Sequence, residues 1–430
     1  MLTGIVFGLA PALFASKVDL TAALKQGARG RLSGSSRELL KVGFLISEVA
    51  LAVIVVIGAA LLGRSILRLY AVDPGFNGQN VLALDVSLPQ SKYKSPLERK
   101  AFFDQATERM RALPGVQSAA AALTLPLNGA NWGSVYVVEG RPVPAQSELP
   151  STPINVVDPA YFQLMEIPLL RGRHFTEFDN ADSPRVTIVN KSMADRWWPN
   201  DDPIGKRIKQ GFPEGQGPHL EIVGVVADVK QNGLDSLDKT EIYLARAQEP
   251  MGSMSIVVKT ASDPLLLTAA VKGAIYEIDK DQPVRGIQPM NNYLSESTAR
   301  KRFLTLLLGF FGAVALILAA MGVYGVMSYS VASRKHEIGI RMALGAKSFD
   351  VLRLVMGQAA LFASIGLAIG LGTSFVVTKW MASELFEVSA QDPLTFISVP
   401  LVLAGVALLA SYIPARRAIR IDPMIALRYE

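Results

Sequence analysis

The sequence predicts a membrane α-helical protein with four transmembrane helices and an extracytoplasmic α+β domain of two lobes. Half of the 430 residues are hydrophobic and 19% are charged. The chain is therefore too apolar for an ordinary soluble protein and too charged to lie wholly in lipid. Four long apolar stretches account for the first property, and a mixed segment of more than 200 residues between the first two stretches accounts for the second.

Each apolar stretch is long enough to cross a bilayer. A hydrocarbon core about 30 Å thick needs roughly 20 apolar residues in helical form. The stretches are Gly43–Leu62, Phe303–Tyr329, Leu354–Thr378 and Pro393–Ala415, and the last three contain no charged residue. Buried helices of soluble proteins rarely run this long without a charge, so we expect all four to span the membrane.

Two features inside the stretches concern helix packing. Glu48 lies near the start of the first stretch, where an intramembrane carboxylate can serve function. Its shallow position favours helix packing or snorkelling over a proton-relay role. Gly366 and Gly370 form a GxxxG pattern in the third stretch, which lets helix backbones approach closely.

The basic residues near the span ends predict the orientation, because cytoplasmic loops carry an excess of Lys and Arg. Fourteen lie on one side and five on the other. The fourteen are Lys17, Lys25, Arg29, Arg31, Arg37, Lys41, Arg334, Lys335, Arg341, Lys347, Arg353, Arg416, Arg417 and Arg420. The five are Arg64, Arg68, Arg300, Lys301 and Arg302. We therefore expect a multi-pass plasma-membrane protein with cytoplasmic termini and residues 72–299 outside. The net charge of +6 then reflects topology, and no nucleic-acid partner is expected.

The outer segment reads as two similar strand–helix–strand units separated by an insert. In the first unit, Val81–Leu88 alternates as a half-buried strand, Ser95 and Glu98 form a capping box, and Val116–Thr124 returns as a strand. The second unit runs from Ser255 to Pro289. We expect one lobe built from two discontinuous halves, residues 73–129 and 249–299, and a strand-rich inserted lobe at 130–248.

No catalytic, cofactor or metal site is evident in the chain. It contains no phosphate-binding G-x-x-x-x-G-K-[ST] loop, no HExxH and no GxSxG, and it has no cysteine. The three histidines, His174, His219 and His336, are far apart in sequence. Trp197 and Trp198 point in different directions on a helix, so we expect one in the core and the other partly exposed. The sequence does not predict an enzyme.

The two ends of the chain resemble each other. Residues 11–25 and 414–428 align without a gap, with proline, alanine, aspartate and leucine matching and lysine opposite arginine twice. We therefore interpret residues 1–37 as the tail of an earlier copy of the same module. Residues 38–72 would form transmembrane helix 1 and a stalk, residues 73–299 the outer domain, and residues 300–430 a second membrane domain with transmembrane helices 2–4.

The loop between the second and third spans carries the most informative string. Residues 333–346 read Ser-Arg-Lys-His-Glu-Ile-Gly-Ile-Arg-Met-Ala-Leu-Gly-Ala. As a helix, this string places Arg334, Glu337 and Arg341 on one face, beside an apolar stripe of Ile338 and Met342. Such a helix can lie on lipid headgroups or insert into a groove of a soluble partner.

This string resembles the hallmark of the MacB/FtsX-type permeases of ABC transport systems. Further motifs of that kind lie along residues 38–430. They are Asp73-Pro-Gly-Phe76, Pro168-Leu-Leu-Arg-Gly-Arg-His-Phe175, Val189-Asn190, Trp198-Pro199, Asp202-Pro-Ile-Gly205 and the terminal Asp422–Arg428. With the terminal repeat, the chain is most similar to the second half of the duplicated, acidobacterial-type permeases, often encoded without an adjacent ATPase.

The resemblance implies that residues 73–299 form a MacB-like periplasmic core domain whose discontinuous lobe is porter-like, and that residues 300–430 form an FtsX-like permease domain. Residues 1–37 would then be the tail of a preceding permease module. The resemblance also implies the bacterial plasma (inner) membrane, a dimer or pseudo-dimer, and ATP hydrolysis by a cytoplasmic subunit. Such systems are said to transmit mechanical work across the membrane rather than pass substrate between their spans. The loop helix, about Arg334–Leu344, would be a coupling helix seated on the ATPase. The expected partner-contact residues are Arg334, Glu337, Ile338, Arg341, Met342 and Gly345.

The function expected from sequence is thus a permease subunit for efflux or mechanotransmission. Its partners would be a cytoplasmic ATP-binding subunit, a second permease copy and the lipid bilayer. Two alternatives remain open: a membrane scaffold or sensor that regulates an envelope enzyme, and a lipoprotein-release permease.

Overall fold

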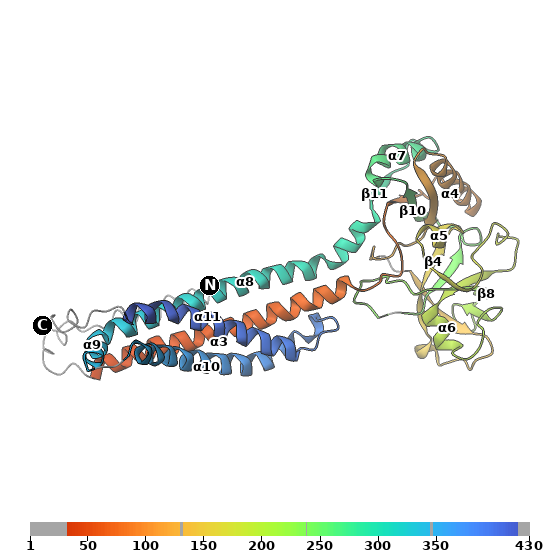
Figure 1. Ribbon diagram of the computed structural model, residues 1–430. Coiled ribbons are helices and arrows are strands. Elements are labelled where there is room, and N and C mark those ends of the chain that lie inside the picture. The colour runs from red at the N-terminus through yellow and green to blue at the C-terminus, as the bar shows by residue number, and fades with distance from the viewer. Residues whose placement is uncertain (1–31, 130–131, 238, 345–346, 420–430) are drawn as a thin grey trace. The chain divides into compact units, whose positions relative to one another are not determined.

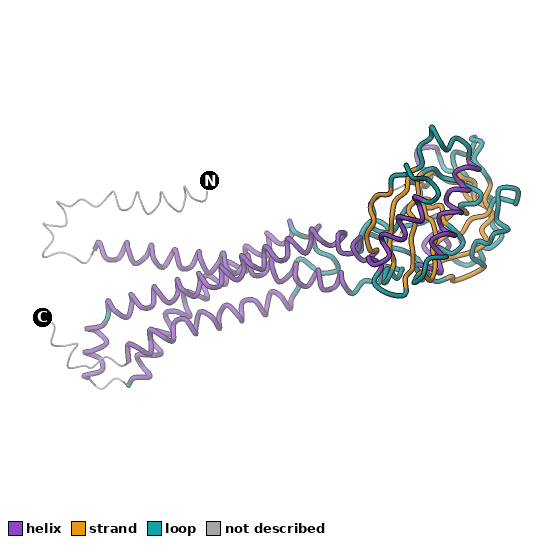
Figure 2. Tube along the Cα trace, turned by 90° about the horizontal axis from the view of Figure 1, so that it is seen from above, coloured by secondary structure: helices purple, strands orange, loops and turns teal. Residues whose placement is uncertain are grey.

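The computed structural model describes residues 32–129, 132–237, 239–344 and 347–419 (Figure 1). The chain divides into two compact units. The membrane unit contains the chain up to Ser65 and from Leu304 onward, and the outer domain is Ile66–Phe303. Helices make up the described part of the membrane unit, whereas all strands lie in the outer domain (Figure 2). The terminal repeat and most of the 1–37 segment lie outside the described residues.

Among the described residues, four helices are long and apolar enough to cross a membrane. They are α3 (Leu32–Tyr70), α8 (Met290–Ser333), α10 (Ser348–Trp380) and α11 (Pro393–Ile419). Each contains one of the four apolar stretches found in the sequence. Together with the α+β content of the outer domain, they confirm the predicted fold class.

Helix α3 is the most buried of the four. Its most apolar window is 50% buried, whereas the corresponding windows of α8, α10 and α11 are between 11% and 22% buried. The buried side chains recur every four residues and so form one ridge along the helix. They are Leu45, Val49, Val53, Ile57 and Leu61.

The GxxxG glycines of α10 pack directly against this ridge. A Cβ atom at Gly366 would lie 2.8 Å from Val49 Cβ, and one at Gly370 would lie 2.7 Å from Val53 Cβ. The Cβ atom added at Gly370 would also lie 2.9 Å from the carbonyl oxygen of Ala50. Only glycine leaves room for this approach, so the close packing expected from the sequence is confirmed.

Glu48 also lies at a helix contact. Its carboxylate touches the backbone of α8 at Gly322, where an added Cβ atom would overlap it. Helix packing, one of the two roles expected for Glu48, therefore agrees with the structure.

Polar contacts lie at the end of the membrane unit where α10 and α11 are joined (Figure 1). Asp392 precedes α11, and its carboxylate accepts hydrogen bonds from the Thr395 amide at 2.8 Å and the Thr395 hydroxyl at 2.7 Å. Arg64 of α3 forms an ion pair with the same carboxylate. The Phe386 amide donates to the Ser65 hydroxyl at 2.8 Å. The α10–α11 loop is thus tied to α3.

The first part of the outer domain interleaves two strand–helix–strand units. They are β1 (Val81–Ser87), α4 (Pro96–Arg111) and β2 (Val116–Ala122), then β10 (Ser253–Thr260), α7 (Thr268–Tyr276) and β11 (Val284–Pro289). The strand order is β11-β1-β10-β2, and all pairs are antiparallel. The capping box is present, because Ser95 and Glu98 each accept a hydrogen bond from the other's amide.

The remaining strands continue the same hydrogen-bonded sheet. They are β3 (Gly133–Val138), β4 (Ser151–Val157), β5 (Leu169–Gly172), β6 (Val186–Asn190), β7 (Arg207–Gln210), β8 (His219–Val226) and β9 (Ile242–Ala245). Strand β4 joins β2 through the single pair Ala122 and Val157. The pairs β4–β9 and β6–β8 are parallel. The short helices α5 (Tyr161–Leu164) and α6 (Lys191–Trp197) complete this part.

Strand β1 differs from the half-buried strand predicted by its alternation. Leu82, Leu84 and Val86 belong to one apolar core, as expected. Val81 and Ala83, on the opposite face, are also fully buried and belong to a second core that contains Tyr161 and Phe162 of α5. Helices α4 and α5 both pack on β2 and β10. The small side chain of Ala83 hid this second buried face from the sequence pattern.

The tryptophan pair divides as predicted. Trp198 is buried in the core. Trp197 is partly exposed, and its indole Nε1 donates to the Tyr136 hydroxyl at 2.8 Å. Both rings therefore have packing partners in the domain.

Replacing Gly370 by alanine is expected to weaken the membrane unit. The new methyl group must displace the α3 ridge at Val53, and such overpacking costs about 1–3 kcal/mol. Thermal unfolding of the purified protein in detergent measures this loss. Gly372→Ala on the same helix is the matched control, since a Cβ atom there meets nothing within 4 Å. Equal stability of the two variants would contradict the packing described here.

Candidate functional site

The loop string predicted to be a coupling helix forms α9 (Lys335–Ala343), nine residues between α8 and α10. It lies at the end of the membrane unit where α8 ends and α10 begins (Figure 1). Arg334 occupies the N-cap position without a side-chain cap, and the Leu344 amide closes the helix by donating to the Ile340 carbonyl at 2.9 Å. Gly345, expected as its C-cap and as a partner contact, lies outside the described residues.

The apolar stripe of α9 faces its own bundle. Ile338 is 3% exposed and Gly339 is buried. Ile338 belongs to the apolar cluster that also contains Val331 and Val351, and Met342 packs against this cluster. From the sequence, this stripe could contact either lipid headgroups or a groove of a soluble partner. The structure uses it to anchor the helix, because neighbouring helices supply an apolar surface there, and Ile338 is inaccessible to a partner.

The polar residues expected to contact a partner lie on the accessible side, with one exception. Arg341 donates to Glu337 at 2.6 Å, and the two side chains are 50% and 49% exposed. Arg334 instead turns toward α10, with its Nη1 atom 3.5 Å from Gln358 Oε1. The i,i+4 pair is thus presented outward, while Arg334 helps to hold the helix start.

Two exposed apolar residues of α9 were missed by the sequence analysis. Ile340 is 39% exposed and Leu344 is 83% exposed. Positions 337, 340, 341 and 344 are three or four residues apart, so they share one helix face. The signal was the Ile338-Gly339-Ile340 spacing, because residues two positions apart on a helix lie on nearly opposite sides, so burial of Ile338 leaves Ile340 outward. We call Glu337, Ile340, Arg341 and Leu344 the α9 surface.

Two contacts between a basic residue and a tyrosine join neighbouring helices near their predicted cytoplasmic ends. The Lys41 ammonium of α3 lies 3.3 Å from the centroid of the Tyr329 ring of α8. Arg417 of α11 donates to the Tyr324 hydroxyl of α8 at 3.0 Å. Tyrosine with a basic neighbour is typical of a membrane–water interface. Both contacts link α8, which leads directly into α9, to other spans.

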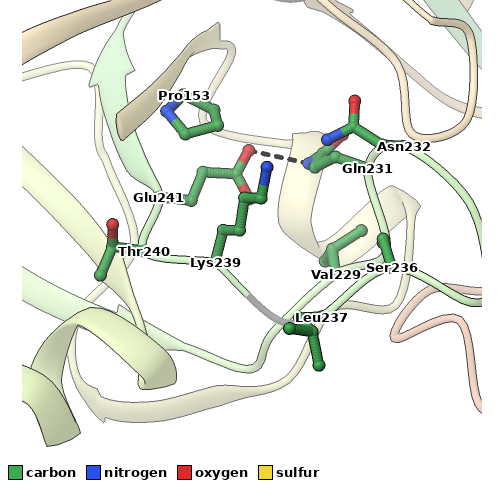
Figure 3. Close-up of a pocket in the computed structure, with 9 residues that line it drawn as sticks. All are labelled: Pro153, Val229, Gln231, Asn232, Ser236, Leu237, Lys239, Thr240 and Glu241. Atoms are coloured by element: carbon green, nitrogen blue, oxygen red, sulfur yellow. Dashed lines mark hydrogen bonds between the residues drawn. The ribbon is translucent and has the colours of Figure 1, made fainter. Parts of the chain in front are cut away.

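The outer domain contains one buried carboxylate with a strongly shifted pKa. Glu241 is 3% exposed, and it accepts a hydrogen bond from the Tyr243 hydroxyl at 2.7 Å. It accepts a second from the Gln231 amide at 2.8 Å, which is drawn in Figure 3. Burial, and further the negative charge of Asp228, raise the pKa of Glu241 to about 7. The adjoining cavity of about 10 Å³ holds at most one water. It is therefore too small for a ligand site.

A buried arginine ties α4 to the sheet. Arg246 forms ion pairs with Asp158, which is also buried, and with Asp104 of α4 at 2.6 Å. Asp158 in turn accepts a hydrogen bond from the Ala121 amide of β2 at 2.7 Å. Lys100 pairs with Asp104 at 2.7 Å, so the two aspartates of this group are matched by two basic residues, which identifies it as a structural network. No group of three or more metal-ligating side chains occurs among the described residues.

Two family descriptions match the chain. Residues 46–274 match the MacB-like periplasmic core domain, and residues 309–423 match the FtsX-like permease C-terminal domain. Together they cover the first span, most of the outer domain and the last three spans.

Three relatives illustrate the similarity. The macrolide export ATP-binding/permease protein MacB of Marinobacter nauticus is 25% identical over 298 residues, which are 65% of this chain and 44% of that protein. The pyoverdine export ATP-binding/permease protein PvdT of Pseudomonas syringae pv. syringae is 26% identical over 61% of this chain and 40% of that protein. The uncharacterized ABC transporter permease YvrN of Bacillus subtilis is 26% identical over 69% of this chain and 74% of that protein. The match spans less than half the length of the first two.

Two solved structures also resemble the chain. The periplasmic region of MacB from Actinobacillus actinomycetemcomitans has a TM-score of 0.34 at 16% identity, over 49% of this chain and 90% of that chain. The extracellular domain of the ABC-type transporter YknZ from Gram-positive bacteria has a TM-score of 0.31 at 14% identity, over 48% of this chain and 99% of that chain.

Replacing Ile338 by alanine is expected to loosen α9 from the bundle. Removing a buried isoleucine side chain costs about 2–5 kcal/mol. Ile340→Ala is the matched control, since its partly exposed side chain can be shortened with a loss of about 0.5 kcal/mol or less. Unfolding in detergent compares the two, and an equal loss for both would argue against the anchoring role of Ile338.

Glu241 is expected to make stability depend on pH. The folded carboxyl keeps its proton up to about pH 7, whereas an ordinary glutamate loses it near 4.5. The folded state therefore binds more protons between these values, so stability falls as the pH rises from about 4.5 to about 7. Glu241→Gln removes this dependence and stabilises the protein above pH 7 by up to about 3 kcal/mol.

Chemical unfolding of the full chain at pH 5 and pH 8, followed by tryptophan fluorescence, checks this expectation. Glu148→Gln, at an exposed site, is the control and should retain the parent pH dependence. A Glu241→Gln protein with the same pH dependence as the parent would refute the assignment.

Proposed function

Because this chain belongs to the family of ABC-transporter permeases with a MacB-like periplasmic core domain and an FtsX-like permease domain, we propose that it couples a cytoplasmic ATPase to its outer domain. The observation that carries the proposal is α9, a short helix between two spans that is anchored by Ile338 and presents Glu337 and Arg341 outward. The ATPase would dock on the α9 surface. The relatives whose names include ATP-binding support such a partner, as does the lack of a phosphate-binding loop in these 430 residues.

The α9 surface suits a transient protein contact. The Glu337–Arg341 pair can exchange its mutual ion pair for charged groups of a partner, while Ile340 and Leu344 offer apolar area beside it. Partner helices that insert into grooves use residues at this spacing. Since the opposite face of α9 is buried in the bundle, a force on the surface would reach α8 and α10 through Ile338.

Helices α3 and α8 are the proposed carriers of that motion. They contain 39 and 44 residues, which corresponds to lengths of about 58 and 66 Å at 1.5 Å per residue. Both exceed the hydrocarbon thickness of about 30 Å. Each continues as one helix from the membrane unit into the outer domain. A displacement at the inner end of an unbroken helix is transmitted along its axis.

The composition of the spans favours mechanical coupling over a conducting path. Within the four apolar stretches, Glu48 is the one charged residue. Its carboxylate packs against the α8 backbone. Intramembrane pathways for polar substrates are lined by ionisable groups. The proposed work is therefore done on the outer side, and the system would serve efflux, with a second permease copy completing it.

Replacing Glu337 and Arg341 together by alanine is expected to uncouple the system. The pair is exposed and contributes less than about 1 kcal/mol to stability, so folding and expression should be retained. We expect stimulation of the co-purified ATPase by this chain to fall at least about tenfold, as it does when a hot-spot contact worth more than 1.4 kcal/mol is lost.

The control is Arg185→Ala with Glu249→Ala, an exposed ion pair of the outer domain with similar exposure of 40% and 39%. It should leave ATPase stimulation unchanged. Normal stimulation in the α9 double variant would contradict the coupling role. Co-purification of an envelope enzyme in place of an ATPase, without nucleotide dependence, would favour a scaffold or sensor.

A further inference from the structure

A loop of the outer domain runs along α8 toward the start of the second span. Residues 230–237 connect strand β8 to the segment before β9. The Lys230 amide donates to the Pro74 carbonyl at 3.0 Å, which fixes the beginning of the loop. Gly78, from the same segment as Pro74, lies against Met290 and Asn291 in the first turn of α8. The loop therefore begins near the first turn of α8.

Further along, the loop reaches a position well down that helix. The Lys301 ammonium donates to the Asp235 carboxylate at 2.7 Å. This partner, and further the charge of Lys230, hold the pKa of Asp235 below its usual range. Residues 291 and 301 are about 15 Å apart along a helix. Asp235 is thus bound to Lys301, which lies two residues before Phe303, where the apolar stretch of the second span begins.

The loop then presents a leucine to its surroundings. Leu237 is 86% exposed, although Leu234 of the same loop is buried. Figure 3 shows Leu237 at the edge of the small cavity, with its side chain directed away from Glu241. The loop is held in shape by the Ser236 hydroxyl and the Lys230 ammonium, which donate to the Gly233 and Ser236 carbonyls at 2.6 and 2.8 Å. Such an ordered loop does not need to expose a leucine for its own packing.

Three exposed basic residues occur in this loop region and beside Lys301 on α8. Arg300 and Arg302 of α8 are exposed, as is Lys239. The loop region itself carries two acidic residues, Asp235 and Asp238, against two lysines. The basic excess therefore comes from residues 300–302, at the level where α8 enters the apolar phase. Apolar side chains flanked by Lys and Arg are the pattern of a surface that lies at a lipid interface.

We propose that Leu237 inserts into the outer-leaflet interface while Arg300, Arg302 and Lys239 bind lipid headgroup phosphates. Residues 230–237 then form a lipid-contacting foot of the outer domain. The occupant is a bilayer surface rather than another protein, because Asp235 of the loop is bound to Lys301, two residues before Phe303, where the apolar stretch of the second span begins. Phe303 is 63% exposed. This inference rests on the proposed extracytoplasmic position of the domain.

The absence of cysteine from the chain gives a direct test. Leu237→Cys carries a single nitroxide label on the full-length protein, reconstituted in vesicles of phosphatidylethanolamine and phosphatidylglycerol. Leu97→Cys, at a leucine that is 75% exposed on α4, is the matched control. We expect the ratio of collisions with oxygen to collisions with a water-soluble nickel chelate to be at least about fivefold higher at 237, because oxygen concentrates in lipid.

Equal collision ratios at the two sites would overturn the proposal. A label at 237 that is shielded from both oxygen and nickel would also overturn it, because shielding from both indicates a protein contact.

The headgroup contacts are tested by adding Lys239→Gln, Arg300→Gln and Arg302→Gln to the Leu237→Cys protein. The ratio should then fall by at least about half. An unchanged ratio would exclude the phosphate contacts. Neutralising Lys94, Arg207 and Lys280, which are exposed elsewhere in the domain, should have no effect.

Failure of the proposed topology can be recognised separately. A membrane-impermeant maleimide added to intact cells should label the Leu97→Cys protein from outside. Labelling only after permeabilisation would overturn the extracytoplasmic assignment and this proposal with it. Outside labelling together with a water-exposed label at 237 would overturn the lipid contact alone.

Discussion

The contact between α3 and the two glycines of α10 is the constraint on which the membrane unit depends. In lipid, apolar surface gains little by leaving its surroundings, so helices associate through close van der Waals packing. The ridge from Leu45 to Leu61 meets α10 where Gly366 and Gly370 have no side chains to separate the backbones. The ion pair of Arg64 with Asp392 and the contact of Lys41 with Tyr329 hold α3 near its two ends. Helix α3 is thereby fixed along its length.

The outer domain obtains its rigidity in a different way. Strands β1 and β10 are about 170 residues apart in sequence, yet they pair from Val81 and Lys259 to Ser87 and Ser253 without a shift. Both faces of this pair are covered, with one core on the side of Leu82 and another on the side of Val81. A sheet buried on both faces resists bending, since each strand is packed from two sides. Such a body can move as a whole when its connecting helices move.

These two properties give the proposed mechanism its physical basis. The α9 helix is bound to the bundle by Ile338 and exposes a charged pair beside apolar side chains. The outer domain contains buried charges, but Arg246 and Lys100 balance Asp158 and Asp104, and Glu241 has no cavity for a ligand. In the proposed mechanism the α9 surface is the docking site, and the outer domain is the rigid body that is moved.

The sequence by itself determined the four spans, the two strand–helix–strand units and the position of α9. These follow from local properties: the length of an apolar stretch, the period of hydrophobic residues and the capping box at Ser95. It missed β5, β7 and β9, which have four residues each, too few to show a period. It also placed Ile338 on the partner surface. Only the tertiary structure decided which face of α9 is buried, which strands pair across the insert, and that Asp235 meets Lys301. The reason is that each of these depends on a neighbour distant in the chain, and a pattern of nearby residues holds no record of that neighbour.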